Sequence, residues 1–150
     1  FCSQAKLFVG NTSGLSGLSY IFGKPIAACN MIPVTSTLVF SKQDTGIPML
    51  IKYKNKKINF RKIFQSPLRN AQEDKIYMAN KDFEIIPNSQ NEVCDLVLEK
   101  LNEINSTFKM SSKDKILQKR FKKFFQNGDS RFHSKSKIGV LFLRKYQHLL

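Results

Sequence analysis

Apolar and small side chains alternate in blocks along the first thirty residues. Residues 6–10 read as a short buried strand that ends at a glycine, and residues 25–30 as a second strand of small apolar residues. Between them, residues 14–22 carry an apolar face at helical spacing, formed by Leu15, Leu18, Ile21 and Phe22. The order of strand, helix and strand predicts a βαβ unit with parallel strands and a right-handed crossover.

The next segment has weaker patterns. Residues 37–42 and 49–54 are candidate strands, and the residues between them, QDTGIP at 43–48, have the chemistry of a turn. The basic segment KYKNKK, residues 52–57, favours a solvated loop. The pattern therefore indicates two strands joined by a turn, without fixing how they pair.

Residues 59–88 contain one short helix and one strand. Asn59 is placed to cap a helix that Pro67 would stop. Residues 68–82 are polar and are assigned to no element, and residues 83–88 read as another strand.

The clearest helix follows Ser89. Ser89 stands three residues before Glu92, which is the spacing of a capping box. Apolar residues then repeat at helical spacing, at Val93, Leu96, Val97, Leu101 and Ile104. The acidic residues lie on the other side, at Glu92, Asp95, Glu99 and Glu103. We expect these carboxylates to form a solvated helix face.

Two further helices are expected near the end of the chain. The first runs from residue 112 to about residue 126, before Gly128, with an apolar side made of Leu117, Phe121, Phe124 and Phe125. Its lysines flank or oppose that side, at Lys115, Lys119, Lys122 and Lys123. A basic amphipathic helix of this kind either lies on an anionic membrane or packs its apolar stripe on the protein. The second helix, about residues 140–149, is dense in large apolar residues.

The amino-acid composition limits the kinds of partner that the chain is expected to bind. The chain has 150 residues, enough for one domain, and a formal net charge of +14. Residues 111–150 carry eleven of the basic residues against two acids, so an anionic partner is one explanation and a general lysine-rich bias is another. Lysines outnumber arginines twenty to five, whereas base reading usually relies on arginine, so we expect no nucleic-acid partner. The three cysteines Cys2, Cys29 and Cys94 are widely spaced, which indicates reduced thiols and no metal site.

The turn after the first strand is the main candidate for chemistry. The first N–H groups of a helix have no intrahelical partner, and the helix dipole adds positive charge, so such a turn can hold a phosphate. The hydroxyls of Thr12, Ser13 and Ser16 could donate further bonds. An ordinary strand-to-helix turn with Thr12 or Ser13 as N-cap explains the residues equally well. The stretch matches neither GxGxxG nor GxxxxGK[ST], which excludes the usual dinucleotide fingerprint and the NTP-hydrolysing loop.

Two segments carry a family resemblance. The segment LFVGNTSGLSGLSYIFGKPIAACN resembles the donor-domain motif of GT-B type glycosyltransferases, in which Ser-Gly opens a helix and GKP leads into the next strand. With the chain end FLRKYQHLL, it is more closely similar to a bacterial family classed with glycosyltransferases of surface-polysaccharide type. The resemblance covers most of the chain and is weakest over residues 45–110.

This resemblance implies an α/β fold, with a Rossmann-like parallel sheet flanked by helices, as the C-terminal half of a GT-B fold. Residues 1–110 would form a partial nucleotide-sugar-binding domain, and residues 111–150 a basic helical C-terminal tail. The implied reaction moves a sugar from a nucleotide diphosphate sugar, the donor substrate, to a surface-polysaccharide or lipid-linked acceptor, with no separate cofactor. The acceptor-binding N-terminal half would lie upstream, and the enzyme would be cytoplasmic, with peripheral contact to an anionic membrane face as a further expectation.

The residues expected to bind the nucleotide sugar lie at the turn and after the second strand: Gly10, Asn11, Thr12, Ser13, Gly14, Leu15, Ser16 and Asn30. Asn30 could bond the nucleotide or sugar, or could simply satisfy the backbone as a turn residue. No catalytic residue is identified. Two alternatives remain open: a non-catalytic α/β domain that docks on anionic membrane or polysaccharide, and a sugar-nucleotide epimerase or pyruvyl transferase. If the other half normally covers apolar surface, Phe142, Leu143 and Leu149 are the candidates for exposure.

Overall fold

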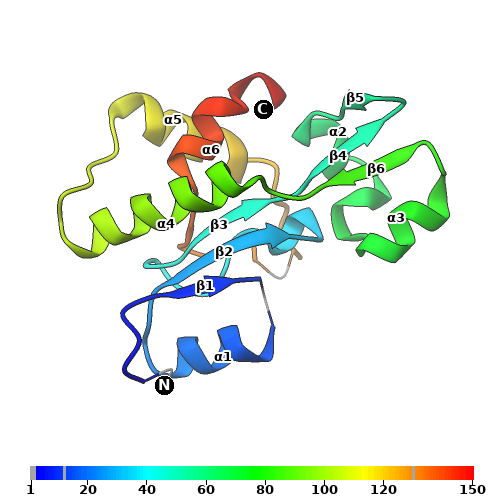
Figure 1. Cartoon of the computed structure of the whole chain (residues 1–150). Helices are drawn as coiled ribbons and strands as arrows, with labels where there is room; N and C mark the ends of the chain where they lie inside the picture. Colours follow the sequence, from blue (N-terminus) through cyan, green and yellow to red (C-terminus); the bar gives the residue numbers. More distant parts are fainter. Residues whose placement is uncertain (1–2, 12, 130) are drawn as a thin grey trace.

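The computed structural model describes residues 3–11, 13–129 and 131–150 and has a mixed α/β architecture (Figure 1). Its main sheet has four parallel strands in the order β1-β2-β3-β7. Their bounds are Phe8–Gly10 for β1, Ile26–Met31 for β2, Thr45–Pro48 for β3 and Lys137–Ile138 for β7. This arrangement confirms the predicted α/β class with a Rossmann-like parallel sheet, including the parallel pairing of the first two strands.

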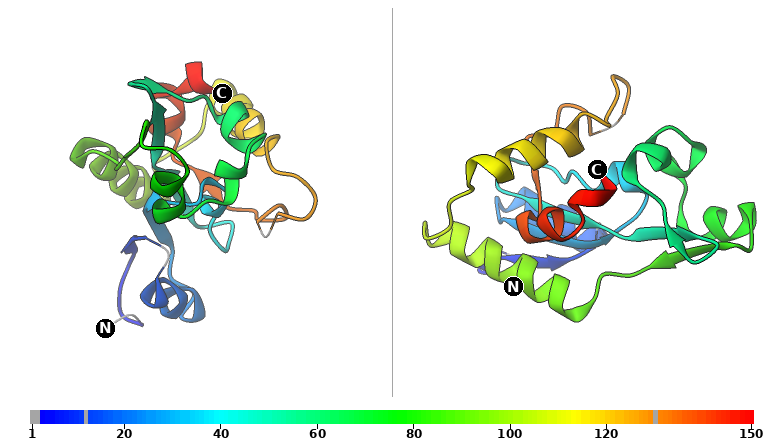
Figure 2. Two further views of the ribbon diagram at one scale, coloured as in Figure 1. Left: turned by 90° about the vertical axis from the view of Figure 1, so that its right-hand side faces the viewer. Right: turned by 90° about the horizontal axis from the view of Figure 1, so that it is seen from above.

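Helices cover both faces of this sheet (Figure 2). Helix α1 (Gly14–Ile21) lies over one face, beside β1 and β2, and helix α4 (Gln90–Ile104) lies over the other, against β2 and β3. Helix α6 (Val140–Lys145) packs against both α4 and α5 (Ser112–Lys122). The side chains of β2 alternate accordingly, so that Ala27 and Cys29 join the core beneath α4 while Ile26 and Ala28 face the other way.

A smaller antiparallel sheet adjoins the first, in the order β5-β4-β6. Strand β4 (Leu50–Tyr53) begins two residues after β3 ends, and β5 (Lys56–Lys57) returns from it as a hairpin. Strand β6 (Phe83–Ile86) pairs on the other side of β4 and leads into α4. The KYKNKK segment, expected as a loop, is therefore this hairpin. The surrounding short elements are η1 (Val34–Ser36), α2 (Phe60–Phe64), η2 (Pro67–Asn70), α3 (Glu73–Ala79) and η3 (Gln147–Leu149).

The expected turn at residues 43–48 is wrong in its second half, because residues 45–48 form the buried strand β3, between β2 and β7. Asp44 supplies the turn chemistry: its carboxylate accepts bonds from the backbone N–H groups of Ile26, Phe40 and Ser41. Gly46 then allows close packing, since a Cβ there would lie 2.1 Å from the carbonyl oxygen of Thr37. Residues 37–42, expected as a strand, have no strand structure. A short strand buried on both faces shows no alternation, and its glycine resembles a turn signal.

Helix α1 is oriented opposite to the expectation. Its apolar residues Leu15, Leu18, Ile21 and Phe22 are exposed, Ile21 at 74%, while Ser16 and Ser19 are buried against the sheet. The buried hydroxyls donate to backbone carbonyls within the helix region, Ser16 to Ser13 and Ser19 to Leu15. Because both hydroxyls are hydrogen-bonded locally, serine is tolerated in the interface, where its small size lets the helix approach the sheet.

The acidic side of α4 is not a solvated face, so that expectation is wrong for three of its four residues. Glu92 and Glu99 are buried, Glu103 is largely buried, and Asp95 alone of the four is exposed. Glu103 pairs with Lys100 and Lys137, and Glu99 accepts backbone bonds at the start of α6. The capping box predicted at Ser89 and Glu92 is confirmed. Carboxylates can be buried here because each has charged or N–H partners.

The apolar side of α5 packs against the protein, which was one of the two alternatives expected for this helix. Phe121 is fully buried and its ring meets those of Phe60 and Phe64 at 5.0 Å and 6.0 Å between centroids. Of the four lysines, Lys122 is half-buried and the other three are exposed. The expectation that Phe142, Leu143 and Leu149 are exposed is wrong, since all three are buried in the core. Phe142 and Leu143 belong to α6, which packs on α4 and α5.

The chain end holds the N-termini of α4 and α5. Arg144 donates two bonds of 2.8 Å to Asp114, the acidic member of the capping box that begins α5. Lys145 and the hydroxyl of Tyr146 donate to Glu92, the corresponding residue of α4, at 2.9 Å and 2.5 Å. The charged residues of FLRKY thus serve as structural partners. No helix in the described part of the chain is long and apolar enough to cross a membrane.

Candidate functional site

The turn between β1 and α1 lies at the carboxyl edge of the parallel sheet. Strand β1 ends at Gly10, and α1 starts at Gly14 with Ser13 as its N-cap, as one of the two candidates for that position. A Cβ added at Gly14 would meet no atom within 4 Å, so the space over the first helical residue is open. None of the hydrogen bonds in the described residues uses the backbone N–H of Gly14 or Leu15. Those two donors can therefore face an external anion.

The two serines of the turn differ in what they can offer a ligand. Ser16 is buried, accepts a bond of 3.2 Å from the backbone N–H of Ser13 and donates one of 2.7 Å to its carbonyl oxygen. Its hydroxyl proton is thus already used inside the turn. Ser13 is exposed, and no hydrogen bond among the described residues uses the proton of its hydroxyl, which therefore remains a donor at the surface.

The remaining turn residues add an amide and an apolar side chain. Asn11 and Leu15 are both exposed, and Gly10 is half-buried. Thr12 lies outside the described residues. Within the described part, the turn therefore brings together exposed Asn11, exposed Ser13 and the open backbone at Gly14.

Asn30 lies at the same edge of the sheet but is engaged elsewhere. Strand β2 pairs Ala28 with Gly10, so Asn30 extends two residues past the end of β1, in the left-handed backbone region at φ 52°. Its backbone N–H donates to Oδ1 of Asn88 at 2.6 Å, and its own Oδ1 accepts the N–H of Asn88 at 2.7 Å. Asn88 also donates from Nδ2 to the carbonyl oxygen of Pro48. This pair ties the ends of β2 and β3 to the start of α4, which favours the turn-residue interpretation of Asn30.

Asn88 is the residue of this edge that sequence analysis missed. It directly precedes the N-cap Ser89, a place where a polar residue is ordinary, and its partner stands 58 residues away in the sequence. No local spacing could have connected the two. The carboxyl edge of the sheet therefore contains the hydrogen-bonded Asn30–Asn88 pair in addition to the predicted turn.

The described residues contain no group of three or more His, Cys, Asp or Glu side chains placed to hold a metal ion. Cys29 and Cys94 are free thiols, and burial raises the pKa of the Cys29 thiol. Cys2 lies outside the described residues. The described residues of the β1–α1 turn offer N–H and hydroxyl donors to a ligand.

Comparison of the chain with protein-family models, with curated proteins and with solved structures finds no significant match. The resemblance to glycosyltransferases thus stays a prediction from the sequence motifs.

Proposed function

We propose that the chain is the donor-binding half of a GT-B type glycosyltransferase, and that the β1–α1 turn holds the diphosphate of a nucleotide sugar. The acceptor, which would be a surface polysaccharide or a lipid-linked sugar, would bind to a separate acceptor domain. That domain would also supply the catalytic base if the reaction needs one, because no residue of the turn is suited to that role.

The observation that supports this proposal is the position of the open helix start. It follows a parallel strand directly, at the carboxyl edge of the sheet, which is where open α/β sheets bind ligands. Gly14 leaves the backbone accessible, and the N–H groups of Gly14 and Leu15 have no partner among the described hydrogen bonds. The exposed Ser13 hydroxyl adds a third donor.

Such donors suit the leaving group of a glycosyl transfer. When the glycosidic bond to the donor breaks, negative charge develops on the departing nucleoside diphosphate. Fixed N–H groups and a helix dipole stabilise that charge without having to reorganise. The turn would therefore both bind the donor and assist its departure.

The test is a titration of the chain with a nucleoside diphosphate, followed by backbone NMR. We expect the amide signals of residues 11 and 13–16 to shift, with an affinity in the ~mM range, as is usual for two or three hydrogen-bonded donors. Shifts confined to the lysine-rich surface of residues 111–150 would contradict the proposal.

Three variants sharpen this test. Gly14→Ala and Gly17→Ala both add a Cβ in open space on α1, so both should keep or raise stability, by about 0.5–1 kcal/mol in the helix interior. Only Gly14→Ala should weaken nucleotide binding, since Gly17 lies one turn further along. Ser13→Asp keeps a good N-cap residue but places negative charge at the anion site, so it should abolish binding without unfolding the chain.

A further inference from the structure

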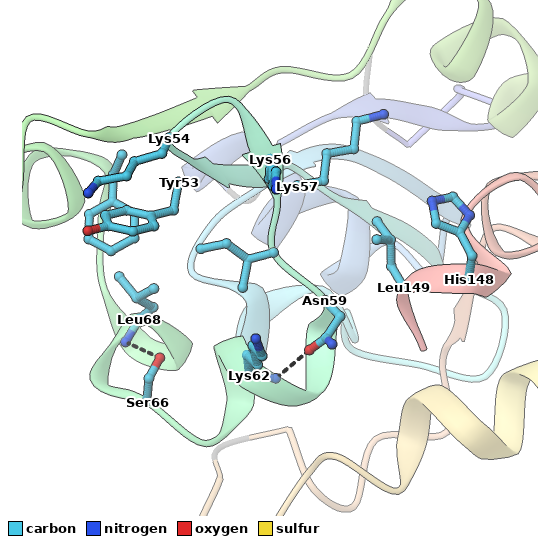
Figure 3. A pocket seen from close by; sticks show the side chains of 12 residues that line it. Tyr53, Lys54, Lys56, Lys57, Asn59, Lys62, Ser66, Leu68, His148 and Leu149 are labelled. Carbon is cyan, nitrogen blue, oxygen red and sulfur yellow. Dashed lines mark hydrogen bonds between the residues drawn. The ribbon is translucent and has the colours of Figure 1, made fainter.

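A cavity of about 710 Å³ lies away from the β1–α1 turn, between the β4–β5 hairpin, α2 with η2, and the chain end (Figure 3). Its volume is within the range of small-molecule sites. Three residues of its walls are held in place by the surrounding structure. Ile58 donates from its backbone N–H to the carbonyl of Ile51, Asn59 caps α2, and Leu149 is buried in the core.

The floor of this cavity is apolar and aromatic. It is lined by Tyr53, Ile58, Leu68, Phe83 and Leu149. The rings of Tyr53 and Phe83 lie 5.1 Å apart between centroids, in a tilted arrangement. This surface would favour an apolar body.

The rim carries four lysines and one histidine. Lys54, Lys56 and Lys57 come from the hairpin, Lys62 comes from α2, and His148 stands at the chain end opposite the hairpin (Figure 3). No Asp or Glu is among the residues that line the cavity.

Half of the rim lysines have partners within the protein. Lys54 has a loose ion pair, at 3.9 Å from Asp82, and the Lys57 ammonium lies 5.0 Å from the centroid of the Tyr146 ring. Lys56 and Lys62 have no ion pair or cation–π contact among the described residues. These two lysines are therefore available to an external anion.

Two polar side chains that line the cavity stabilise its wall. Oδ1 of Asn59 accepts the backbone N–H of Lys62 at 2.9 Å. The Ser66 hydroxyl donates to the Ile63 carbonyl at 3.0 Å and accepts the N–H of Leu68. The cavity therefore offers a ligand positive charge at its rim and apolar contact on its floor.

We propose that this cavity binds a phosphate monoester with an apolar body, such as an alkyl phosphate. The apolar body lies on the Tyr53–Phe83 floor, and the phosphate dianion lies between Lys56 of the hairpin and Lys62 of α2. Lysines bind phosphate as point charges, and two of them from separate segments suit a doubly charged group better than a single carboxylate. This site is independent of the nucleotide-sugar proposal.

The experiment titrates the full chain with octyl phosphate, and separately with inorganic phosphate and with octyl glucoside below its micelle concentration. Binding is measured by calorimetry and located by backbone NMR. We expect octyl phosphate to bind at least roughly tenfold more tightly than either control, because each control lacks one of the two contacts. The shifted signals should belong to residues 53–68, 83 and 148–149.

The decisive variant changes Lys56 and Lys62 together to Gln. It should lower octyl phosphate affinity by roughly tenfold or more, since it removes the two cations nearest the phosphate. The matched control changes two exposed lysines of α5, Lys113 and Lys115, to Gln and removes the same net charge. It should leave the affinity unchanged.

Four outcomes would overturn the proposal. The first is that octyl phosphate does not bind, and the second is that the rim variant binds it as tightly as the parent chain does. The third is that inorganic phosphate binds as tightly as octyl phosphate, which would mean that the lysines form an anion-binding patch without a role for the apolar floor. The fourth is preferential binding of a single-stranded oligonucleotide through the same lysines, which would assign the surface to a polyanion.

Discussion

The buried carboxylate of Glu99 should make the stability of this protein depend on pH near neutrality. Glu99 is 3% exposed and accepts the N–H of Val140 at 2.8 Å and that of Leu141 at 3.3 Å. Burial raises its pKa from 4.5 to about 7, although the two N–H bonds act in the opposite direction. Nearby Glu103 adds to the rise, and Lys137 reduces it.

The sign follows from proton binding. Between pH 4.5 and about 7 the folded protein keeps the proton of Glu99, whereas the unfolded chain releases it. The stabilisation is therefore complete below pH 4.5 and is lost as the pH rises through about 7. At about 1.4 kcal/mol for each pH unit, this difference amounts to about 3 kcal/mol of unfolding free energy.

The assay is urea unfolding of the parent chain and of Glu99→Gln at several pH values from 5 to 8. Glutamine has nearly the same shape but does not titrate. Its different hydrogen bonding therefore changes the free energy of unfolding by the same amount at every pH and leaves the pH dependence unaffected. Groups common to both proteins cancel in the difference. We expect the parent chain to lose about 3 kcal/mol more than the variant over this range.

The control is Glu84→Gln, which removes an exposed carboxylate paired with Lys52 but keeps Glu99, so its stability should fall with rising pH in parallel with that of the parent chain. If the difference between the parent chain and Glu99→Gln changes by less than about 1 kcal/mol from pH 5 to 8, the carboxylate is ionised throughout and the reasoning from burial is refuted.

Three further predictions concern packing and pairing. Phe121→Ala should cost about 3–5 kcal/mol in urea unfolding, because this fully buried ring joins α5 to α2; a loss below 1 kcal/mol would contradict that packing. Ile21→Gln should change stability by less than about 0.5 kcal/mol, since the side chain is 74% exposed; a large loss would mean that the apolar face of α1 is buried after all. Arg144→Met should cost about 1–2 kcal/mol at pH 7, because buried Asp114 loses its partner while the half-exposed guanidinium is partly screened. Arg144 holds the pKa of Asp114 well below its usual value of 3.8, so this cost should shrink as the pH falls below that value; an equal loss at pH 3 and pH 7 would argue against an ionic origin.

Elements with local signals were predictable from the sequence. The capping box at Ser89 located the start of α4, and Asn59 located that of α2, because each cap and its partner lie three residues apart. The β1–α1–β2 unit followed from three adjacent patterns. The site was predictable to the same extent, as a turn of small residues at the carboxyl edge of the sheet.

What failed depended on distant partners. Glu99 was expected in solvent because nothing near it in the sequence reveals Val140, which is 41 residues away and supplies its N–H. The same holds for Asn30 and Asn88 at the site. Helix α1 failed for another reason: hydrophobic periodicity identifies a face but not which way it turns, and the buried side of α1 carries serines satisfied by its own backbone.

The contacts of residues 137–146 bear on the order in which this domain can fold during synthesis. These residues supply both the outer strand beside β3 and the cations that neutralise Asp114 and Glu92. While the ribosome still holds them, the nascent chain has an unpaired strand edge and two carboxylates without their cations. Such an intermediate is prone to association with other chains and exposes a surface that chaperones can bind. Pairing of this edge must therefore wait until residues 137–146 have left the ribosome, and a truncation that removes them should lead to proteolysis rather than to a slightly weakened protein.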